Sequence, residues 1–381
     1  SGSMIPYGRQ EITEKDIESV VDVLRSDFLT QGSVVPKFEH KLCEYTGAEN
    51  AIAVNSCTSA LHIACLALNL GPGDILWTSP ISFVASANCG LYCGASVDFV
   101  DIDPNTALLS IKKLEEKLQY AKKKGKLPKI VIPVHFGGQP CDMKEIYALS
   151  KKYNFKIIED AAHAIGAKYQ DKLIGSCQYS DITVFSFHPV KIITTGEGGV
   201  AMTNNLQLSD RMRLLRSHGI TRDVSKMKNK PDGAWYYEQI DLGFNYRMTD
   251  IQAALGISQL NRIEQYVSRR NEIAEWYNKK FRTTDISPLM QKMGRSSAYH
   301  LYVILIKGGR QQRDVLYNYL LKNDIGVNLH YIPVYKHPFF NKNSCLENAE
   351  YYYKHAISLP IYPTISSKDL NKVVDKILCY I

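Results

Sequence analysis

The sequence predicts an α/β protein with a large domain built on a mostly parallel sheet and a smaller α+β domain near the C-terminus. Short apolar runs such as Ile130–Val134 alternate with helical stretches between Ala51 and about Asn204. This rhythm is typical of parallel strands connected by helices. Strand and helix patterns then mix between Tyr299 and Cys379. The 381 residues are sufficient for two hydrophobic cores.

A first helix is predicted close to the N-terminus. Thr13 and Asp16 have the spacing of a capping box, in which each side chain bonds the backbone N–H group of the other residue. The apolar residues after them repeat with helical spacing and share one face: Ile17, Val20, Val21 and Leu24. We expect this helix to belong to the large domain, which we predict to span residues 4–248.

The next elements are a strand at Ala51–Val54 and a helix pattern that runs through Leu70. Between them, the stretch Asn55–Ser59 brings hydroxyl groups to the N-terminus of the helix. Free backbone N–H groups, the helix dipole and the hydroxyls of Thr58 and Ser59 together predict an anion site. An ordinary Ser/Thr helix cap is the alternative interpretation.

A second candidate position ends the apolar run Phe155–Asp160. The run has the length of a buried parallel strand, and the C-terminal ends of such strands face the ligand crevice of an open α/β sheet. Asp160 is therefore placed to present a carboxylate to a ligand. A helix N-cap is the alternative role for one aspartate at a strand end.

A single lysine, Lys191, lies among turn-forming and hydroxyl residues in the stretch Ser186–Gly199. Desolvation disfavours the charged form of a buried amine, so an isolated lysine in such a setting becomes a nucleophile. The glycines behind it allow the backbone to pass close to a ligand. Ser186 adds another hydroxyl donor for an anion. A surface lysine in a turn is the common alternative.

These positions together predict a pyridoxal phosphate site. The cofactor needs an anion site for its phosphate, a carboxylate against its pyridine nitrogen and a lysine that forms a Schiff base with its aldehyde. Thr58 and Ser59, Asp160 and Lys191 supply these groups in one chain. Each motif has an ordinary structural explanation by itself, whereas their joint occurrence favours the cofactor.

The remaining sequence predicts a bridging helix and a small domain within residues 249–381. Thr249 opens a helix pattern that continues to about Lys280 and bridges the two domains. The later patterns predict a strand at Tyr299–Ile306, a helix at Gln311–Leu321, a strand at Gly326–His330 and a final helix at Leu370–Cys379. This mixture is typical of an α+β domain.

Two glycine-rich stretches have simpler explanations than a ligand site. Gly71–Asp74 lacks the third glycine of a dinucleotide-binding loop and follows a helix, so a turn is predicted and a nicotinamide enzyme is disfavoured. His135–Gln139 follows a strand and is able to line the site, but a glycine-rich loop explains it more simply.

Composition predicts a cytoplasmic protein. The nine cysteines form no paired CxxC units, so neither a disulfide framework nor a metal site is expected. No apolar stretch has the length of a membrane span, and no signal-peptide pattern follows Met4. The net charge of +8 is modest, and the densest basic run, Lys122–Lys126, lacks the aromatic residues typical of nucleic-acid surfaces. Neither a membrane nor a nucleic acid is therefore predicted as a partner.

The sequence resembles the DegT/StrS type of sugar aminotransferases along nearly its whole length. The stretches that carry the resemblance are Thr30–Gly32, Ser56–Ala60, Ser79–Val84, Glu159–His163, Ser186–Gly199 and Gly243–Asp250. Members of this family are fold type I pyridoxal phosphate enzymes that act on nucleotide-linked keto sugars. The resemblance therefore implies that fold, with a seven-stranded, mostly parallel sheet. Within the family the likeness is greatest to the 4-aminotransferases of pseudaminic acid biosynthesis.

The resemblance implies a role for each matching residue at the cofactor ring. Lys191 matches the Schiff-base lysine, which also moves the proton between substrate carbon and cofactor. Asp160 matches the carboxylate on the pyridine nitrogen, and His163 matches a residue that contacts the ring or its phenolic oxygen, although a structural histidine is the alternative. Phe83 matches the aromatic residue stacked on the ring, with a core phenylalanine as the alternative.

The resemblance also implies how the phosphate is held. Thr58, Ser59 and Ser186 match the phosphate cradle. Asn245 matches a residue that the family donates to this phosphate from the neighbouring subunit. A homodimer with shared active sites is therefore expected.

Four further residues are candidate substrate contacts. Arg247 is suited to bind the carboxylate of the amino donor, whereas a turn or a surface ion pair is the alternative. His330 and Tyr331 lie in a stretch that borders the sugar-nucleotide pocket of the family, with aromatic packing as the alternative. Tyr7, near the N-terminus, is the fourth candidate.

The implied reaction moves an amino group from L-glutamate to C4 of a UDP-linked 4-keto-6-deoxy-N-acetylhexose, in the synthesis of UDP-4-amino-4,6-dideoxy-N-acetyl-beta-L-altrosamine. A related aminotransferase acting at C3, or on another sugar or nucleotide, shares all these motifs. A dehydratase branch of the family has histidine at the lysine position, so Lys191 argues for amino transfer. A non-catalytic regulatory protein on the same scaffold is the alternative from a different class.

Overall fold

The computed structural model describes residues 3–340 and 345–381, and its centre is a seven-stranded sheet. The strands stand in the order β1-β9-β8-β5-β4-β2-β3. Their bounds are Asn50–Val54 (β1), Ile75–Thr78 (β2), Ser96–Phe99 (β3), Ile130–Ile132 (β4), Lys156–Asp160 (β5), Ile182–Ser186 (β8) and Gly199–Thr203 (β9). The strands from β8 to β3 are parallel, and β9 is antiparallel to both of its neighbours. The predicted α/β class with a mostly parallel sheet is confirmed.

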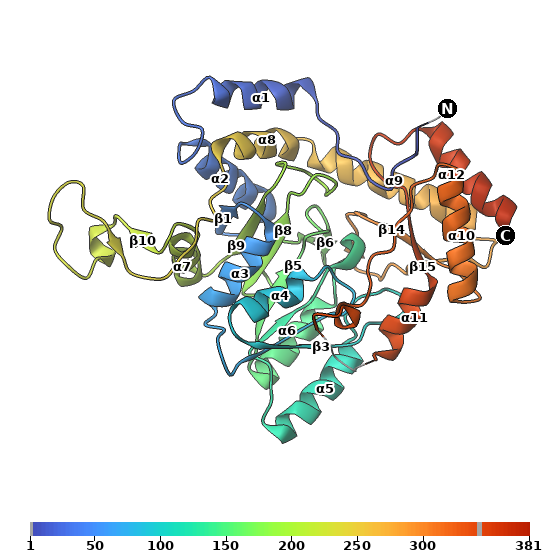
Figure 1. The fold of residues 1–381 in the computed structure, drawn as a ribbon, viewed down its shortest axis with the longest axis horizontal. Coiled ribbons are helices and arrows are strands. Elements are labelled where there is room, and N and C mark those ends of the chain that lie inside the picture. Colours follow the sequence, from blue (N-terminus) through green and yellow to red (C-terminus); the bar gives the residue numbers. More distant parts are fainter. Residues whose placement is uncertain (1–2, 341–344) are drawn as a thin grey trace.

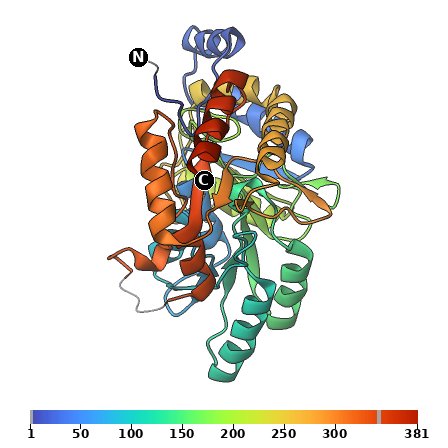
Figure 2. The same ribbon diagram turned by 90° about the vertical axis from the view of Figure 1, so that its right-hand side faces the viewer.

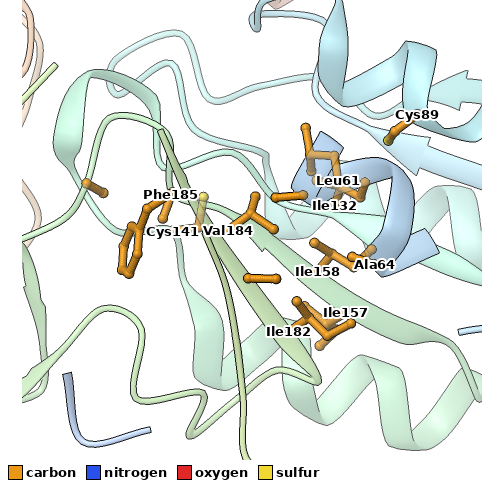
Figure 3. Packing of buried hydrophobic residues seen from close by; sticks show 14 of the residues in the cluster. Leu61, Ala64, Cys89, Ile132, Cys141, Ile157, Ile158, Ile182, Val184 and Phe185 are labelled. Carbon is orange, nitrogen blue, oxygen red and sulfur yellow. The ribbon is translucent and has the colours of Figure 1, made fainter. Parts of the chain in front are cut away.

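Helices pack against this sheet (Figure 1). The first seven are Glu14–Leu24 (α1), Val34–Thr46 (α2), Cys57–Ala67 (α3), Ala85–Tyr92 (α4), Ile111–Lys124 (α5), Met143–Tyr153 (α6) and Leu206–Arg216 (α7). Figure 3 shows Leu61 and Ala64 of α3 beside Ile158 of β5, and all three side chains are buried. Because the central strands are buried on both faces, their sequences are continuous apolar runs and not alternating ones.

The N-terminal helix α1 begins with the predicted capping box. Thr13 N–H bonds Asp16 Oδ2 at 2.9 Å, and Asp16 N–H bonds Thr13 Oγ1 at 3.4 Å. The helix lies outermost, over α8 (Asp250–Leu260), in both views of the fold (Figures 1 and 2). Ile17 and Leu24 of the predicted apolar stripe are exposed. Val20 and Val21 are half-buried, so the described part of the chain covers this stripe only in part.

The C-terminal part has its own buried cluster, formed mainly by residues from Ile273 onward together with Ile5. Its antiparallel sheet joins Ser287–Pro288 (β12), Tyr302–Leu305 (β14) and Ala356–Leu359 (β15). The helices are Ile263–Phe281 (α9), Arg310–Lys322 (α10), Glu347–His355 (α11) and Ser367–Tyr380 (α12). The helices predicted at 311–321 and 370–379 are confirmed as α10 and α12, whereas α11 and β15 were not predicted.

The helical region expected from Thr249 to about Lys280 is confirmed, but it consists of two helices, α8 and α9, with a break after Leu260. Another prediction for this part was wrong. The strand expected at Gly326–His330 is reduced to a single bridge between Asn328 and Ser358. Its other backbone donors are used locally or by the N-terminal segment: Gly326 N–H bonds Ile5 O, and Leu329 N–H bonds the Asn328 side chain.

The strand predicted at Tyr299–Ile306 begins three residues later, at Tyr302. The carbonyl groups of Tyr299 and His300 accept hydrogen bonds from the buried Arg270 guanidinium, at 2.9 and 3.3 Å. These carbonyls are therefore turned away from a strand ladder. Smaller elements complete the chain: the strands Lys168–Tyr169 (β6), Lys172–Leu173 (β7) and Arg295–Ser296 (β13), and 3-10 helices at Phe136–Gly138, Val224–Lys226 and Val334–Lys336.

One segment projects away from the body of the molecule. Residues 218–243, here called the arm, lie between α7 and α8 and contain a hairpin of Ile220–Thr221 (β10) and Glu238–Gln239 (β11). Figure 1 shows the arm extending beyond the sheet at the left. Its large apolar side chains include Trp235 and Leu242, which are exposed. The arm thus presents apolar surface that the described chain does not cover.

None of the helices in residues 3–340 and 345–381 is both long enough and apolar enough to cross a membrane. The 19-residue α9, for example, carries charged side chains such as Glu264 and Lys279. Within the same described residues, no group of three or more His, Cys, Asp or Glu side chains is arranged to hold a metal ion.

Candidate active site

Most of the predicted site residues gather at one edge of the sheet, where β5 and β8 end and α3 begins. Asp160 is the last residue of β5, and Ser186 is the last residue of β8. Because β5 and β8 are parallel neighbours, their C-terminal ends open to the same side. The loop that follows β8 carries Lys191, and Thr58 and Ser59 lie in the first turn of α3.

The Asp160 carboxylate is buried and held by two donors. Ser86 Oγ donates to Oδ2 at 2.5 Å, and the Ala162 backbone N–H donates to Oδ1 at 3.1 Å. Each oxygen therefore keeps a free lone pair. A buried carboxylate with spare acceptor capacity is suited to accept a hydrogen bond from a protonated ligand nitrogen.

The loop that carries Lys191 is fixed by its neighbours. Thr195 N–H and Thr194 Oγ1 both donate to Phe187 O at 3.0 Å, and Thr194 N–H bonds Gln259 Oε1 at 3.3 Å. Lys191 N–H donates to His188 O at 3.0 Å, which closes a turn at the lysine itself. Hydrogen bonds within the loop and to Gln259 thus set the backbone position of Lys191 between β8 and β9.

The Lys191 amine has the electrostatics of a nucleophile. Desolvation lowers its pKa below the ordinary lysine value, and the nearby charge of Asp160 opposes this shift only in part. A lowered pKa raises the fraction of neutral amine near pH 7. The mutual effect of the Lys191 and Asp160 charges also indicates that the structure brings these two residues together.

The N-terminus of α3 forms an anion cradle. Ser56 caps the helix by accepting the Ser59 N–H at 3.0 Å, and the N–H groups of Cys57 and Thr58 bond no other part of residues 3–340 and 345–381. Two free N–H groups at a helix N-terminus bind anions well. The Ser59 hydroxyl, however, donates to Asn55 Oδ1 at 2.5 Å, so it is occupied in this structure.

Gly199 of β9 allows this cradle to form. It pairs with Val54 on one side and with Ser186 on the other. A Cβ atom at Gly199 would lie 2.5 Å from the Cys57 nitrogen and 2.6 Å from the Ser56 carbonyl carbon. The strand backbone therefore lies directly against the helix N-terminus, and only glycine permits this approach. The cradle and the adjacent Ser186 hydroxyl fit a phosphate.

His163 is a neutral, buried histidine with a determined tautomer. The Gly137 N–H donates to His163 Nδ1 at 3.0 Å, so the ring proton is on Nε2, which lies 3.0 Å from the Tyr331 hydroxyl. Burial lowers the pKa of His163 well below its usual value, and the positive charge of Lys191 lowers it further. The ring of His300 packs on it with centroids 4.5 Å apart.

The two candidate substrate residues from the C-terminal part, His330 and Tyr331, reach the same site. Burial lowers the pKa of His330 to about 3, and the charge of Lys191 acts in the same direction. His330 Nδ1 lies 2.8 Å from Ser358 Oγ, and its ring packs on Tyr7 with centroids 5.3 Å apart. Tyr7, His330 and Tyr331 therefore form one contact cluster with His163.

Phe83, the aromatic residue predicted to stack on the cofactor ring, has an exposed side chain. It lies between β2 and α4 and is 61% exposed. An exposed phenylalanine one residue after the buried Ser82 is not a core residue. The alternative of a core phenylalanine was wrong, and the ring is available to stack on a ligand.

Asn245 and Arg247 follow the arm and lie beside the end of β1. Asn55 N–H bonds Tyr246 O at 2.9 Å, and Arg247 forms a bridge with Val54. Asn245 is exposed. Arg247 lines a cleft of about 220 Å³ together with Gln31, Gly32, Val35, Pro36, Arg216, Ser217 and Met248, none of which is acidic.

The sequence interpretation missed the group that holds Asp160. Ser86 and Ser82 are buried, and their hydroxyls lie 2.7 Å apart. The signal was present in the sequence as two hydroxyls spaced four residues apart, the spacing of one helix face. Their partner, Asp160, is 74 residues away, so no local pattern connects them.

These groups fit pyridoxal phosphate. The cradle of α3 suits its phosphate, Asp160 suits its pyridine nitrogen and Lys191 suits its aldehyde. Phe83 offers a face for the ring. The phosphate, the pyridine nitrogen and the aldehyde of the cofactor would thus each meet a protein group of complementary chemistry.

Comparisons with known proteins agree with this geometry. Residues 10–378 match the sequence model of the DegT/DnrJ/EryC1/StrS aminotransferase family. A curated relative from Campylobacter jejuni, the UDP-4-amino-4,6-dideoxy-N-acetyl-beta-L-altrosamine transaminase, is 40% identical over 98% of this chain and 96% of its own length.

Solved structures are similar over the whole chain. PseC from Helicobacter pylori, an aminotransferase involved in the biosynthesis of pseudoaminic acid, has a TM-score of 0.90 and 30% identity, with 99% of each chain covered. The putative sugar aminotransferase Spr1654 from Streptococcus pneumoniae, in its PLP form, has a TM-score of 0.88 and 28% identity, covering 98% of this chain and 97% of that one.

Proposed function

This chain belongs to the DegT/DnrJ/EryC1/StrS aminotransferase family, and on that premise we propose that it moves an amino group from L-glutamate to C4 of a UDP-linked 4-keto-6-deoxy-N-acetylhexose. It is a pyridoxal phosphate-dependent aminotransferase. The observation that carries the proposed substrate is the 40% identity, over nearly the full length, to a transaminase named for this aminosugar. The product would be UDP-4-amino-4,6-dideoxy-N-acetyl-beta-L-altrosamine, an intermediate of pseudaminic acid synthesis.

We propose that the residues at the sheet edge divide the work of the reaction. Pyridoxal phosphate supplies the electron-withdrawing ring that stabilises a carbanion at the substrate carbon. Asp160 accepts the hydrogen bond of the ring nitrogen and so keeps that nitrogen protonated. The α3 N-terminus, with Thr58 and Ser186, holds the phosphate, and Ser59 adds its hydroxyl when it turns from Asn55 Oδ1 to the phosphate. Phe83 covers one face of the ring.

In this proposal Lys191 is both the attachment point and the proton carrier. Its lowered pKa supplies a neutral amine that can take a proton from the α carbon of L-glutamate. In the second half-reaction the same amine moves a proton at C4 of the sugar. His163 is held neutral with its proton on Nε2, so it donates a hydrogen bond and does not add charge near the ring.

We propose that the sugar lies against the residues contributed by the C-terminal part. Tyr7, His330 and Tyr331 lie in contact with one another and with His163. Hydroxyl and imidazole groups are suited to the hydroxyls and the N-acetyl group of a sugar. Arg247 is suited to bind a carboxylate of L-glutamate through two parallel hydrogen bonds, because the cleft that it lines contains no acidic residue.

The protein is further proposed to be a cytoplasmic homodimer with shared active sites. The exposed apolar residues of α1 and of the arm, among them Leu24 and Trp235, support burial against a second copy. Asn245, exposed at the base of the arm, is proposed to reach the phosphate in the partner's site. The separate buried cluster near the C-terminus supports a division into a large domain, 4–248, and a bridging helix with a small domain, 249–381.

An absorption experiment tests the reaction. Purified protein is loaded with pyridoxal phosphate and then treated with L-glutamate and with UDP-linked keto sugars, while the visible band of the bound cofactor is followed. The band should fall with glutamate and return with the 4-keto sugar, and mass spectrometry and NMR should place the new amine at C4. Lys191→Ala should form no such band.

Other outcomes would redirect or reject the proposal. A higher kcat/KM for a 3-keto sugar would make the protein a C3 aminotransferase of the same family. A wild-type protein that forms no band with the cofactor would reject the reaction and favour a regulatory role.

Mixing two inactive variants tests the shared site. Lys191→Ala and Asn245→Ala are each expected to lower activity strongly, but co-refolded mixtures contain dimers with one site that has Lys191 from one chain and Asn245 from the other. Such mixtures should recover up to about a quarter of wild-type activity, because half the dimers are mixed and each has one intact site. A chain that carries both substitutions is the control. No recovery above the two separate variants would reject the shared site.

A further inference from the structure

We propose that Ser86 is a positioning residue: with Ser82 behind it, it donates a hydrogen bond to Asp160 and so keeps the proton on the pyridine nitrogen of the cofactor. This inference rests on the proposed aminotransferase reaction and adds to it a hydroxyl relay, defined here as Ser82, Ser86 and Asp160. All three side chains are at least 95% buried.

The direction of the relay follows from its chemistry. The ionised Asp160 side chain can only accept, so Ser86 gives its single proton to Oδ2 across 2.5 Å. Ser86 Oγ can then only accept from Ser82 Oγ, which lies 2.7 Å away. Ser82 Oγ also lies 2.9 Å from the Phe83 carbonyl oxygen, so its proton is shared between two acceptors. The donors therefore point toward the carboxylate.

The backbone that carries Ser86 is fixed by packing. Ser86 lies in the first turn of α4, and Gly90 one turn later is pressed against the sheet. A Cβ atom at Gly90 would lie 2.9 Å from a methyl carbon of Val97 and 3.3 Å from Leu76. Cys89 Sγ donates to the Ser86 carbonyl at 3.2 Å. The hydroxyl of Ser86 is thus held at a set distance from the end of β5.

The relay also lies beside the proposed ring contact. Phe83 follows Ser82 directly and precedes Ser86 by three residues. One short segment therefore offers an aromatic face to the ring and a donor to the carboxylate that binds the ring nitrogen. Removal of the Ser86 hydroxyl leaves this segment in place, so the two effects can be separated.

The Ser86 hydroxyl matters because it influences whether Asp160 or the pyridine nitrogen holds the proton that lies between them. Asp160 has two protein donors, Ser86 and the Ala162 N–H. Each donated hydrogen bond stabilises the negative charge of a buried carboxylate. Without Ser86 the carboxylate becomes a stronger base and draws the proton from the ring nitrogen. A ring without that proton withdraws electrons less strongly, and proton removal from the substrate slows.

The position of this proton can be measured directly. Wild type, Ser86→Ala, Ser86→Thr and Ser82→Ala are loaded with pyridoxal phosphate labelled with ¹⁵N in the ring, and the ¹⁵N chemical shift is recorded. The shift of Ser86→Ala should move toward the unprotonated value, and Ser86→Thr should restore the wild-type shift because it keeps the hydroxyl. Ser150→Ala is the matched control, since this buried hydroxyl donates only to Tyr147 O in α6.

Kinetics provide a second readout that a purely structural role would not move. For Ser86→Ala, kcat of the glutamate half-reaction should fall roughly tenfold to a hundredfold, the effect of one hydrogen bond to a charged group. The KM for L-glutamate should change by less than about twofold, because Ser86 does not touch the substrate.

The outcomes divide clearly. An unchanged ¹⁵N shift in a folded, cofactor-loaded Ser86→Ala protein would overturn the relay. If Ser86→Ala does not fold, Ser82→Ala takes its place and should give the same change at smaller size; an unchanged shift there would also overturn it. A wild type that binds no cofactor would instead reject the proposed function, so the two failures are distinguishable.

Discussion

The two carboxylates at the end of β5 lie side by side in the sequence but serve opposite faces of the strand. Glu159 and Asp160 are equally buried, at 4% and 5% exposure. Glu159 is enclosed by His135, Ser180 and Thr183. Asp160 points toward the loop of Lys191 and the helix N-terminus. Burial therefore does not distinguish a structural from a functional carboxylate here.

Hydrogen-bond saturation does distinguish them. Glu159 Oε1 accepts from His135 Nε2 at 2.8 Å, and Oε2 accepts from Ser180 and Thr183 at 2.5 and 2.8 Å. His135 Nδ1 accepts the Cys141 N–H at 2.9 Å, which fixes the donor proton on Nε2. Among the residues that the structure describes, Asp160 has only two protein donors. The saturated carboxylate is complete within the chain, whereas the other keeps capacity for a ligand.

The largest loss of activity should come from substitution of Lys191, the residue near Asp160 that is proposed to bind the cofactor. Lys191→Ala removes both the attachment to the cofactor and the proton carrier, so kcat should fall by at least about 10⁴-fold. The melting temperature should change little, because the Lys191 amine forms no hydrogen bond within residues 3–340 and 345–381. Activity and thermal unfolding are measured with Lys126→Ala, an exposed lysine, as the control. Substantial remaining turnover would contradict the assignment.

The next effect tests the unsaturated carboxylate itself. Asp160→Asn replaces an acceptor by an amide that can present N–H to the ring nitrogen, so that nitrogen loses its proton. The rate of the glutamate half-reaction should fall by about 10² to 10³-fold, the usual loss for one electrostatic partner of the reacting group. Single-turnover kinetics measure it. An equal loss of rate in Glu159→Gln would contradict the different roles assigned to Glu159 and Asp160.

Glu159→Gln should lower the stability of the protein and leave turnover nearly unchanged, which is the opposite of the effect expected for Asp160→Asn. The neutral amide cannot accept three hydrogen bonds in the same arrangement, and it leaves buried donors without partners. We expect a loss of roughly 2–4 kcal/mol in the free energy of unfolding. Turnover per folded molecule should stay within about threefold of wild type, since Glu159 does not face the ligand. Urea unfolding and active-site titration check the two halves of this expectation.

The smallest expected effect is the pH dependence of the stability that Glu159 contributes to the folded protein. Burial raises the pKa of Glu159, but hydrogen bonds from His135, Ser180 and Thr183 outweigh it, so the pKa lies below its ordinary value. A carboxyl with a lowered folded-state pKa stabilises the protein above its unfolded pKa of about 4.3, and this contribution is lost as pH falls through the folded value. The difference between wild type and Glu159→Gln should therefore shrink below about pH 4. A difference that is constant from pH 7 to 3.5 would contradict it.

Much of this arrangement could be predicted from sequence because it is local. The strand ending at Asp160, the capping box of Thr13 and the helix-opening hydroxyls of Thr58 and Ser59 are all short-range patterns. They arise from periodicity and from backbone groups a few residues apart. Their positions in the structure agree with the sequence interpretation.

The parts that could not be predicted depend on contacts between distant residues. Ser86 lies 74 residues from Asp160, and His163 lies 168 residues from Tyr331. The strand expected near Asn328 failed because its donors bond Ile5 and a side chain, which periodicity does not reveal. The exposure of Leu24 on α1 likewise depends on what covers the helix, and a repeat pattern cannot tell which chain that is.

Gly199 has a consequence for how this protein tolerates change. It contacts no proposed ligand group directly, yet any side chain there would displace the backbone of Cys57 and Ser56. Phe83, by contrast, touches few neighbours and leaves room for other aromatic rings. In a library of all single substitutions, Gly199 should therefore be among the positions that tolerate the fewest replacements. Phe83 should tolerate more, especially other aromatic residues. Engineers who alter sugar preference should keep the β9 backbone unchanged and vary the pocket wall instead.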